Sequence, residues 1–243
     1  MAALQVQVSH LMRTSDLRLI RRLPLFADIA AAHFDELVAG AFLQAFPARL
    51  ELIREGELPD FLHIVVEGTV ELYGMAEVRE TALAMLEANA TFVLAAVVRD
   101  EVYLTSARTL APARILMIPA GAVREVFDKD AAFARATVQE LARRYRDVVR
   151  DLKSMKLRTG IERLANYILR LVDEQARKGV VELPVEKRTL ASYLGMTPEN
   201  LSRAFAQLSE HGLDVRGQTL IITDKARLRR LAKPLPLIDA RDP

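Results

Sequence analysis

The sequence predicts an α+β protein in which an N-terminal antiparallel β-roll is followed by a long helix and a C-terminal winged helix-turn-helix. Three successive patterns of apolar spacing lead to this prediction. Apolar residues alternate with a period of two between about residues 41 and 119. They then follow a 4-3-4-3 spacing from 134 to 155, and finally form two short runs of helical period between 190 and 213.

The composition limits the class of protein. The 243 residues can form one large domain or two ordinary ones, and a hydrophobic content of 51% is enough for a packed core. The chain has no cysteine, which excludes disulfides, thiolate zinc fingers and cysteine-ligated iron–sulfur clusters. The N-terminus lacks the layout of a signal peptide and no run of 18 apolar residues occurs, so we expect a cytoplasmic protein with no membrane partner.

No catalytic site can be assembled from the sequence. The four histidines are scattered, and the chain contains no nucleophile elbow, P-loop or dinucleotide-binding fingerprint. We therefore expect a protein that is not an enzyme.

The N-terminal part is predicted to contain helical pieces followed by the strands of the roll. Asp28 is a candidate N-cap for a short helix. The segment 61–74 alternates between apolar and polar residues and predicts a β-hairpin with its turn at Glu67-Gly68. The segment 102–119 predicts two further strands.

The 4-3-4-3 spacing predicts one long helix with an a/d seam of about three heptads. Such a seam needs an apolar partner, which is either the chain's own roll or a second copy of the helix. The C-terminal part of the seam is better explained by a parallel homodimer. The predicted dimer interface consists of Ala134, Val138, Leu141, Tyr145, Val148, Leu152 and Met155.

Residues 190–213 predict a helix-turn-helix. Gly195 suits a helix end that needs a left-handed residue, and Thr197-Pro198-Glu199 is typical of a helix start. The second helix has an apolar stripe for burial and a polar face that can enter a DNA major groove. The alternative is an ordinary helical hairpin with a solvated face. The polar face consists of Glu199, Asn200, Ser202, Arg203 and Gln207.

The C-terminal segment adds a wing and a modest positive charge. Residues 215–223 predict a hairpin that turns at Gly217-Gln218, and such wings usually lie along the phosphate backbone. From Lys187 onward, ten Lys and Arg residues outnumber six acids, although the net charge of the whole chain is only +2. We therefore predict a sensor domain (1–124), a dimerisation helix (125–157) and a DNA-binding domain (158–243).

A β-roll, a long helix and a winged helix-turn-helix in this order resemble the CRP/FNR superfamily of bacterial transcription regulators. The strand pair FLHIVVEGTV and the strand RILMIP are similar to the cyclic-nucleotide-binding roll of that family, and IERLANYIL is similar to its lead-in to the DNA-binding domain. Glu199, Ser202 and Arg203 match the E-x-x-S-R pattern of the FNR branch. The chain is thus similar to the haem-dependent, nitric-oxide-responsive denitrification regulators.

The resemblance implies a homodimer that binds double-stranded DNA at an inverted repeat near TTGAT-N4-ATCAA, with RNA polymerase as a further partner if the protein is an activator. In the family, the glutamate accepts a hydrogen bond from a cytosine and the arginine makes a bidentate contact with a guanine, as the major-groove code allows. The implied DNA-binding residues are Lys187, Thr197, Glu199, Asn200, Ser202, Arg203, Gln207 and Arg216.

The resemblance also bears on the effector. Alignment to the cyclic-nucleotide binders places Val93 and Leu94 at one ligand-binding pair, and Tyr103 and Leu104 at the other. All four polar functions are replaced, and a buried phosphate without a positive partner is strongly disfavoured, so we expect no cyclic AMP binding. An apolar pocket lined by these residues would suit a haem.

A haem would need an axial ligand, for which the candidates are His10, His33 and His63. The sequence pattern favours a surface position for both His33 and His63. The signal would then be a gas such as nitric oxide. Two alternatives are a regulator without ligand that is controlled by its own abundance, and a signalling module whose helix-turn-helix contacts protein.

Overall fold

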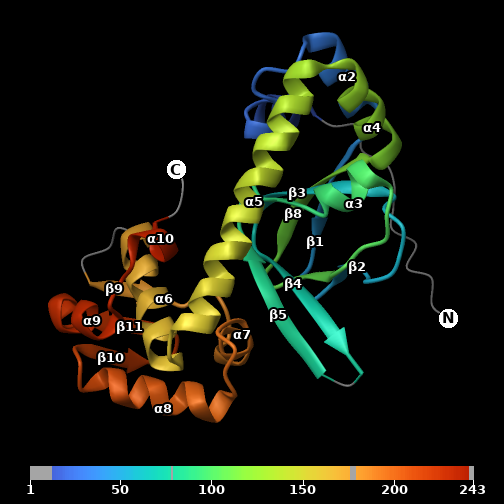
Figure 1. Cartoon of the computed structure of the whole chain (residues 1–243). Coiled ribbons are helices and arrows are strands. Elements are labelled where there is room, and N and C mark those ends of the chain that lie inside the picture. The colour runs from blue at the N-terminus through green and yellow to red at the C-terminus, as the bar shows by residue number, and fades with distance from the viewer. Residues whose placement is uncertain (1–12, 78, 176–178, 241–243) are drawn as a thin grey trace. The chain divides into compact units, whose positions relative to one another are not determined.

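The computed structural model of the chain describes residues 13–77, 79–175 and 179–240 (Figure 1). The described residues fall into two compact units. The first combines Met1–Gly74 with Ala84–Ala142, and the second combines Met75–Leu83 with Arg143–Pro243. No helix of the described ranges is long and apolar enough to cross a membrane.

The first unit contains the β-roll, which consists of two antiparallel sheets. One sheet has the strand order β1-β8-β3-β6 and the other has the order β2-β7-β4-β5. The strands are β1 (Phe42–Phe46), β2 (Glu51–Ile53), β3 (Phe61–Glu67), β4 (Val70–Ala76), β5 (Arg79–Leu86), β6 (Thr91–Phe92), β7 (Ser106–Thr109) and β8 (Ala113–Pro119). The helices are α1 (Thr14–Arg21), the 3-10 turn η1 (Pro24–Phe26), α2 (Ala31–Ala39), α3 (Leu94–Arg99) and α4 (Ala120–Lys129).

The predicted hairpin at residues 61–74 is wrong, because β3 and β4 belong to different sheets. Gly68 lies at the corner between them and has a φ of +89°. The amide of Leu110 donates to the carbonyl of Thr69 over 2.9 Å, so the β7–β8 connection packs against the same corner. Alternation identified both strands, but the hydrogen-bonding partner of each strand depends on segments distant in the sequence.

Strand β3 is buried on both faces, which explains its nearly continuous apolar sequence. Leu62 and Ile64 face a cluster that the first sheet shares with α2, α3 and α4. Val65 faces a second cluster together with Phe92 and Ile115, which occupies the interior of the roll.

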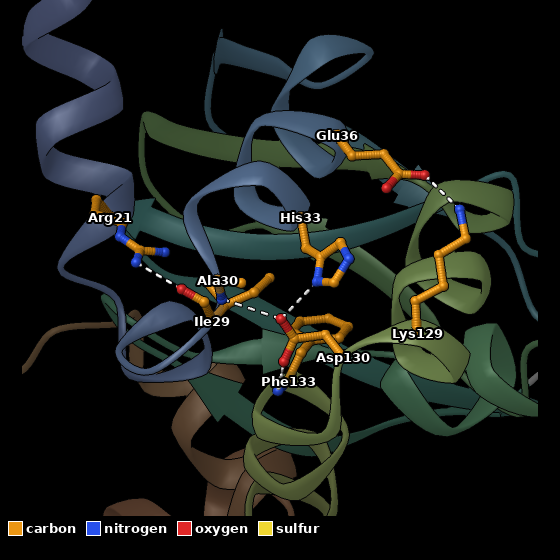
Figure 2. A network of polar contacts seen from close by, with 8 residues as sticks. All are labelled: Arg21, Ile29, Ala30, His33, Glu36, Lys129, Asp130 and Phe133. Carbon is orange, nitrogen blue, oxygen red and sulfur yellow. Dashed lines mark hydrogen bonds and ion pairs between the residues drawn. The ribbon is translucent and has the colours of Figure 1, made fainter.

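The carboxylate of Asp130 joins two helices of this unit (Figure 2). Its Oδ1 accepts from the amide of Phe133 over 2.9 Å and so caps the start of α5 (Ala131–Leu157). Its Oδ2 accepts from the amide of Ala30 at the start of α2 over 3.0 Å and from Nδ1 of His33 over 2.8 Å. The hydrogen bond from Phe133, followed by that from His33, lowers the pKa of Asp130 to about 2.

The predicted N-cap at Asp28 is therefore wrong. The helix begins at Ala31 after Ala30, whose own side chain makes no capping hydrogen bond. The negative charge at this helix start comes from Asp130, a residue 100 positions away from Ala30. Local sequence could not show it.

The second unit consists mainly of helices around a three-stranded sheet with the order β10-β11-β9. Its helices are α6 (Gly160–Gln175), α7 (Lys187–Tyr193), α8 (Pro198–Ser209), α9 (Lys225–Ala232) and α10 (Pro236–Asp239). Its strands are β9 (Val180–Glu182), β10 (Leu213–Arg216) and β11 (Thr219–Ile222). Strands β10 and β11 form the predicted wing, because Arg216 pairs with Thr219 across the turn at Gly217-Gln218.

The corner at Gly68 yields a stability prediction. A methyl group on Gly68 would lie 2.5 Å from the carbonyl oxygen of Pro112 and 2.8 Å from Cα of Ala113, both of them backbone atoms. We expect Gly68→Ala to lower the free energy of unfolding by about 2–4 kcal/mol, since left-handed strain and overpacking add. Urea denaturation followed by circular dichroism measures the decrease.

Gly56→Ala is the matched control, because Gly56 has a φ of +88° but no atom within 4 Å of the added methyl group. It should cost only the strain, about 1–2 kcal/mol. Equal decreases in the two variants would contradict the packing of the β7–β8 connection against the corner.

Candidate nucleic-acid interface

The first helix of the helix-turn-helix, α7, ends as the sequence predicts. Gly195 has a φ of +62°. The amide of Met196 donates to the carbonyl of Ala191 over 2.8 Å, and the amide of Gly195 donates to that of Ser192 over 2.9 Å. This hydrogen-bond pair is the Schellman arrangement, which satisfies the last carbonyls of the helix and reverses the chain.

The second helix, α8, also starts as predicted. Thr197 is its N-cap, and the threonine Oγ1 accepts from the amide of Asn200 over 3.2 Å. Pro198 occupies the first turn, where a missing amide hydrogen costs nothing. Glu199 follows near the positive end of the helix dipole.

The two faces of α8 differ as the periodicity predicts. Leu201, Phe205 and Leu208 are at most 6% exposed and pack into the unit. The polar side chains Glu199, Asn200, Ser202, Arg203 and Gln207 are all exposed on the other face. Because the buried stripe fixes the rotation of the helix, this polar face is presented to solvent as one surface.

The electrostatics of this face suit hydrogen bonding to base edges. The pKa of Glu199 is lowered by a hydrogen bond from its own backbone amide and by the hydroxyl of Thr197, with a smaller effect from Arg203. Glu199 is therefore an ionised acceptor at neutral pH. Arg203 lies one turn along the same helix and offers the planar donor fork that matches a guanine edge.

Two other predicted DNA-binding residues lie on neighbouring elements. Lys187 is the first residue of α7, and its Nζ lies 5.2 Å from the centre of the Phe205 ring. Arg216 ends β10 on the wing, where it is exposed and pairs with Asp214 over 2.9 Å. Both cations thus belong to the same unit as α8, at positions separate from its exposed polar face.

The sequence analysis did not predict the role of Arg163, whose side chain is hydrogen-bonded to the turn between α7 and α8. Its Nε donates to the carbonyl of Leu194 over 2.8 Å and its Nη1 donates to that of Arg158 over 2.7 Å. Burial lowers its pKa. The guanidinium thus joins the end of α7 to the end of α5, and only its position at the start of an amphipathic helix could have signalled this role.

The predicted dimer residues on α5 fall into two groups, one buried or half-buried and one exposed. Leu141 packs against the core of the first unit, as the alternative partner for the seam would require, and Ala134 is half-buried. The remaining seam residues are exposed on the described chain. They are Val138 (58%), Tyr145 (70%), Val148 (64%), Leu152 (55%) and Met155 (43%).

The residues predicted to line an apolar effector pocket do not come together. Tyr103 is buried inside the roll with Val93 beside it, but Leu94 belongs to the other cluster and Leu104 is 82% exposed. The expectation that these four residues line one apolar pocket is therefore corrected, because alignment to a family does not show which side chains the fold buries together.

Of the three histidine candidates, the structure corrects the expected surface position of His63. His10 lies outside the described residues, and Nδ1 of His33 donates to Asp130. His63 is not on the surface but 4% exposed, because β3 is covered on both faces. Its ring stacks on Phe92 at 5.1 Å, and its Nδ1 has no hydrogen-bond partner among the residues that the structure describes. A haem ligand among the three histidines stays a prediction.

Comparison with known proteins matches both parts of the chain. A model of the Crp-like helix-turn-helix domain covers residues 162–231, and a model of the cyclic nucleotide-binding domain covers residues 43–130. The transcriptional activator protein Anr of Pseudomonas aeruginosa is 22% identical over 186 residues, or 74% of this chain and 76% of Anr.

One further sequence relative and one solved structure are also similar to this chain. The nitrogen fixation regulation protein FixK of Bradyrhizobium diazoefficiens is 32% identical over 101 residues, or 39% of this chain and 43% of FixK. The solved structure of FixK2 from Bradyrhizobium japonicum has a TM-score of 0.70 at 22% identity, and it covers 79% of this chain and 96% of that one. At this identity the structural likeness shows the fold alone.

The fold and the exposed face of α8 thus define a transcription regulator with a winged helix-turn-helix. Both halves of the chain are thus similar to domains of the CRP/FNR superfamily, and its relatives are transcription regulators of the DNA-binding type.

The buried imidazole of His63 yields a pH prediction. Burial lowers its pKa from 6.5 to about 4, so the folded protein keeps it neutral while the unfolded chain takes up a proton below pH 6.5. The free energy of unfolding should therefore fall as the pH falls from 6.5 toward 4, by about 3 kcal/mol over the whole range. Urea denaturation at several pH values measures this slope.

His63→Phe removes the titrating group and keeps an aromatic ring beside Phe92. Its stability should be flat between pH 6.5 and 5.5, a window above the pH at which the carboxyl groups of Asp130 and Glu162 begin to take up protons in the unfolded chain. The same slope in this variant and in the wild-type protein would contradict the assignment.

Proposed function

We propose that this protein is a homodimer that regulates transcription by reading an FNR-like inverted repeat, of the type TTGAT-N4-ATCAA. The observation that carries the proposal is the exposed face of α8 with Glu199, Ser202 and Arg203 in the E-x-x-S-R order. Glu199 accepts from the amino group of a cytosine, and Arg203 makes a bidentate contact with a guanine. The similarity to Anr and FixK supports placement in the FNR branch.

A homodimer is supported by the exposed apolar seam of α5. Tyr145, Val148 and Leu152 are each more than half exposed. Their spacing follows the a/d pattern of a parallel two-stranded coiled coil, so pairing with a second copy removes this surface from water. The two-fold axis would then place the recognition helices about 34 Å apart, one turn of DNA.

The proposal names no effector. Haem, with a gas such as nitric oxide as the signal, stays a prediction, and so does the absence of cyclic AMP binding. RNA polymerase as a partner stays a prediction that depends on activation rather than repression.

Replacement of Arg203 tests the base reading. We expect Arg203→Ala to weaken binding to the TTGAT palindrome by about 1–3 kcal/mol of binding free energy, and to abolish the preference for guanine at the contacted position. Fluorescence anisotropy with the palindrome, a guanine-substituted duplex and a scrambled duplex measures both effects at one fixed salt concentration.

Lys187→Ala is the contrasting variant, since a phosphate contact carries no sequence information. It should weaken binding to all three duplexes by the same factor. The proposal fails if the wild-type protein binds the palindrome and the scrambled duplex equally, or if Arg203→Ala keeps the full guanine preference.

A charge in the seam tests the dimer. Val148→Asp places a carboxylate at an exposed position, so the single chain should fold normally while the paired helices separate. Sedimentation velocity should show a shift from twice 27.2 kDa to 27.2 kDa. Leu104→Asp, at an exposed apolar residue outside the seam, should remain a dimer. A wild-type monomer, or a dimeric Val148→Asp, would contradict the proposed interface.

A further inference from the structure

A hollow of about 450 Å³ opens on the second unit. Thr159 and Glu162 line it from the start of α6, Arg227 and Arg230 from α9, and His211 from the segment after α8. All of these elements belong to one compact unit. None of the residues was predicted to bind DNA.

The hollow lies beside the recognition helix. His211 is the second residue after the end of α8. At the other end, a methyl group on Gly160 would lie 2.7 Å from the sulfur of Met196, which directly precedes the N-cap Thr197. The walls of the hollow thus begin next to both ends of the helix that presents Glu199 and Arg203.

The hollow contains uncompensated positive charge. Arg227 and Arg230 are three residues apart and therefore share one face of α9. Both side chains are exposed, and neither has an ion-pair partner in the part of the chain that the structure describes.

The single acid in the lining is already occupied. Glu162 accepts from the amide of Thr159 over 2.9 Å and from Nζ of Lys233 over 2.9 Å. These contacts lower the pKa of Glu162 to about 2, the amide of Thr159 having the larger effect. Lys233 balances the charge of Glu162, so the two arginines leave a surplus of two positive charges.

We propose that this hollow binds a phosphate group through the guanidinium groups of Arg227 and Arg230. Guanidinium forks match phosphate oxygens in a bidentate geometry, and His211 and Thr159 offer further polar groups on the walls. The phosphate comes either from the DNA backbone outside the bases that α8 reads or from a soluble phosphate compound. The first source rests on the proposed function and extends the DNA site beyond the inverted repeat.

The third arginine of α9 provides a matched control. Arg229 lies on the same helix and is also exposed, but it lines a different groove together with Asn166 and Tyr167. Arg229→Ala therefore removes the same charge from α9 without touching the hollow.

The first arm of the test uses DNA. A minimal TTGAT palindrome is compared with one that carries six more base pairs at each end, over a range of salt concentrations. Wild-type protein and Arg229→Ala should bind the longer duplex more tightly. The double variant Arg227→Ala/Arg230→Ala should bind the two duplexes equally. Its salt dependence should fall by about 0.9 in log–log slope for each phosphate that the arginines no longer neutralise.

The second arm uses inorganic phosphate, titrated by calorimetry at constant ionic strength with chloride as the replaced anion. Saturable binding that is abolished in the double variant and kept in Arg229→Ala identifies a soluble phosphate as the source. Far-ultraviolet circular dichroism and thermal unfolding confirm that each variant is folded.

The two arms distinguish failure of the phosphate-binding proposal from failure of the proposed function. If the wild-type protein does not distinguish the palindrome from a scrambled duplex, the proposed function fails and the phosphate titration alone decides on the hollow. The proposal is overturned if the double variant matches Arg229→Ala in both arms.

Discussion

Burial of one stripe of α8 is the constraint on which the proposed DNA-binding surface depends. Leu201, Phe205 and Leu208 are almost entirely removed from water, and each such burial contributes about 1.5–3 kcal/mol. Because these residues recur at helical spacing, a rotation of α8 about its axis would expose them and bury polar groups without partners. The stripe thereby determines that Glu199 and Arg203 point toward solvent. The proposed base reading thus depends on packing on the opposite side of the same helix.

Backbone hydrogen bonds at the end of α7 and at the start of α8 also fix the orientation of α8. A left-handed Gly195 completes the hydrogen bonds at the end of α7, and Thr197 completes those at the start of α8. Arg163 then satisfies the carbonyls of Leu194 and Arg158, which ties the turn to the end of the long helix. A buried polar group without a partner costs about 1–3 kcal/mol, so these contacts restrict the angle between α7 and α8. The same principle makes Asp130 important in the first unit, where one carboxylate serves the starts of both α2 and α5.

The sequence was sufficient where the decisive interactions are local. The turn at Gly195, the cap at Thr197 and the stripe of α8 involve residues within a few positions of one another, and the structure confirms all three. The sequence was insufficient where partners are distant. It paired β3 with β4 although the roll assigns them to different sheets, and it chose Asp28 where Asp130 acts. His63 was expected at the surface because alternation does not show that helices and a second sheet cover both faces of β3. The contacts of Arg163 and the hollow beside α9 also arise from segments distant in the sequence, and for Arg163 the only local signal is its position at the start of an amphipathic helix.

The central claim is that two copies of α8, related by a two-fold axis, read two half-sites on one face of the DNA. Its most direct measurement is the affinity of the protein for TTGAT-N4-ATCAA and for the same half-sites separated by five more base pairs. Five base pairs rotate one half-site by about half a turn, to the opposite face of the duplex. The account predicts that Kd for the longer spacer rises at least about tenfold, toward the value for a single half-site, at the same salt concentration. Equal affinity for the two spacers would contradict it.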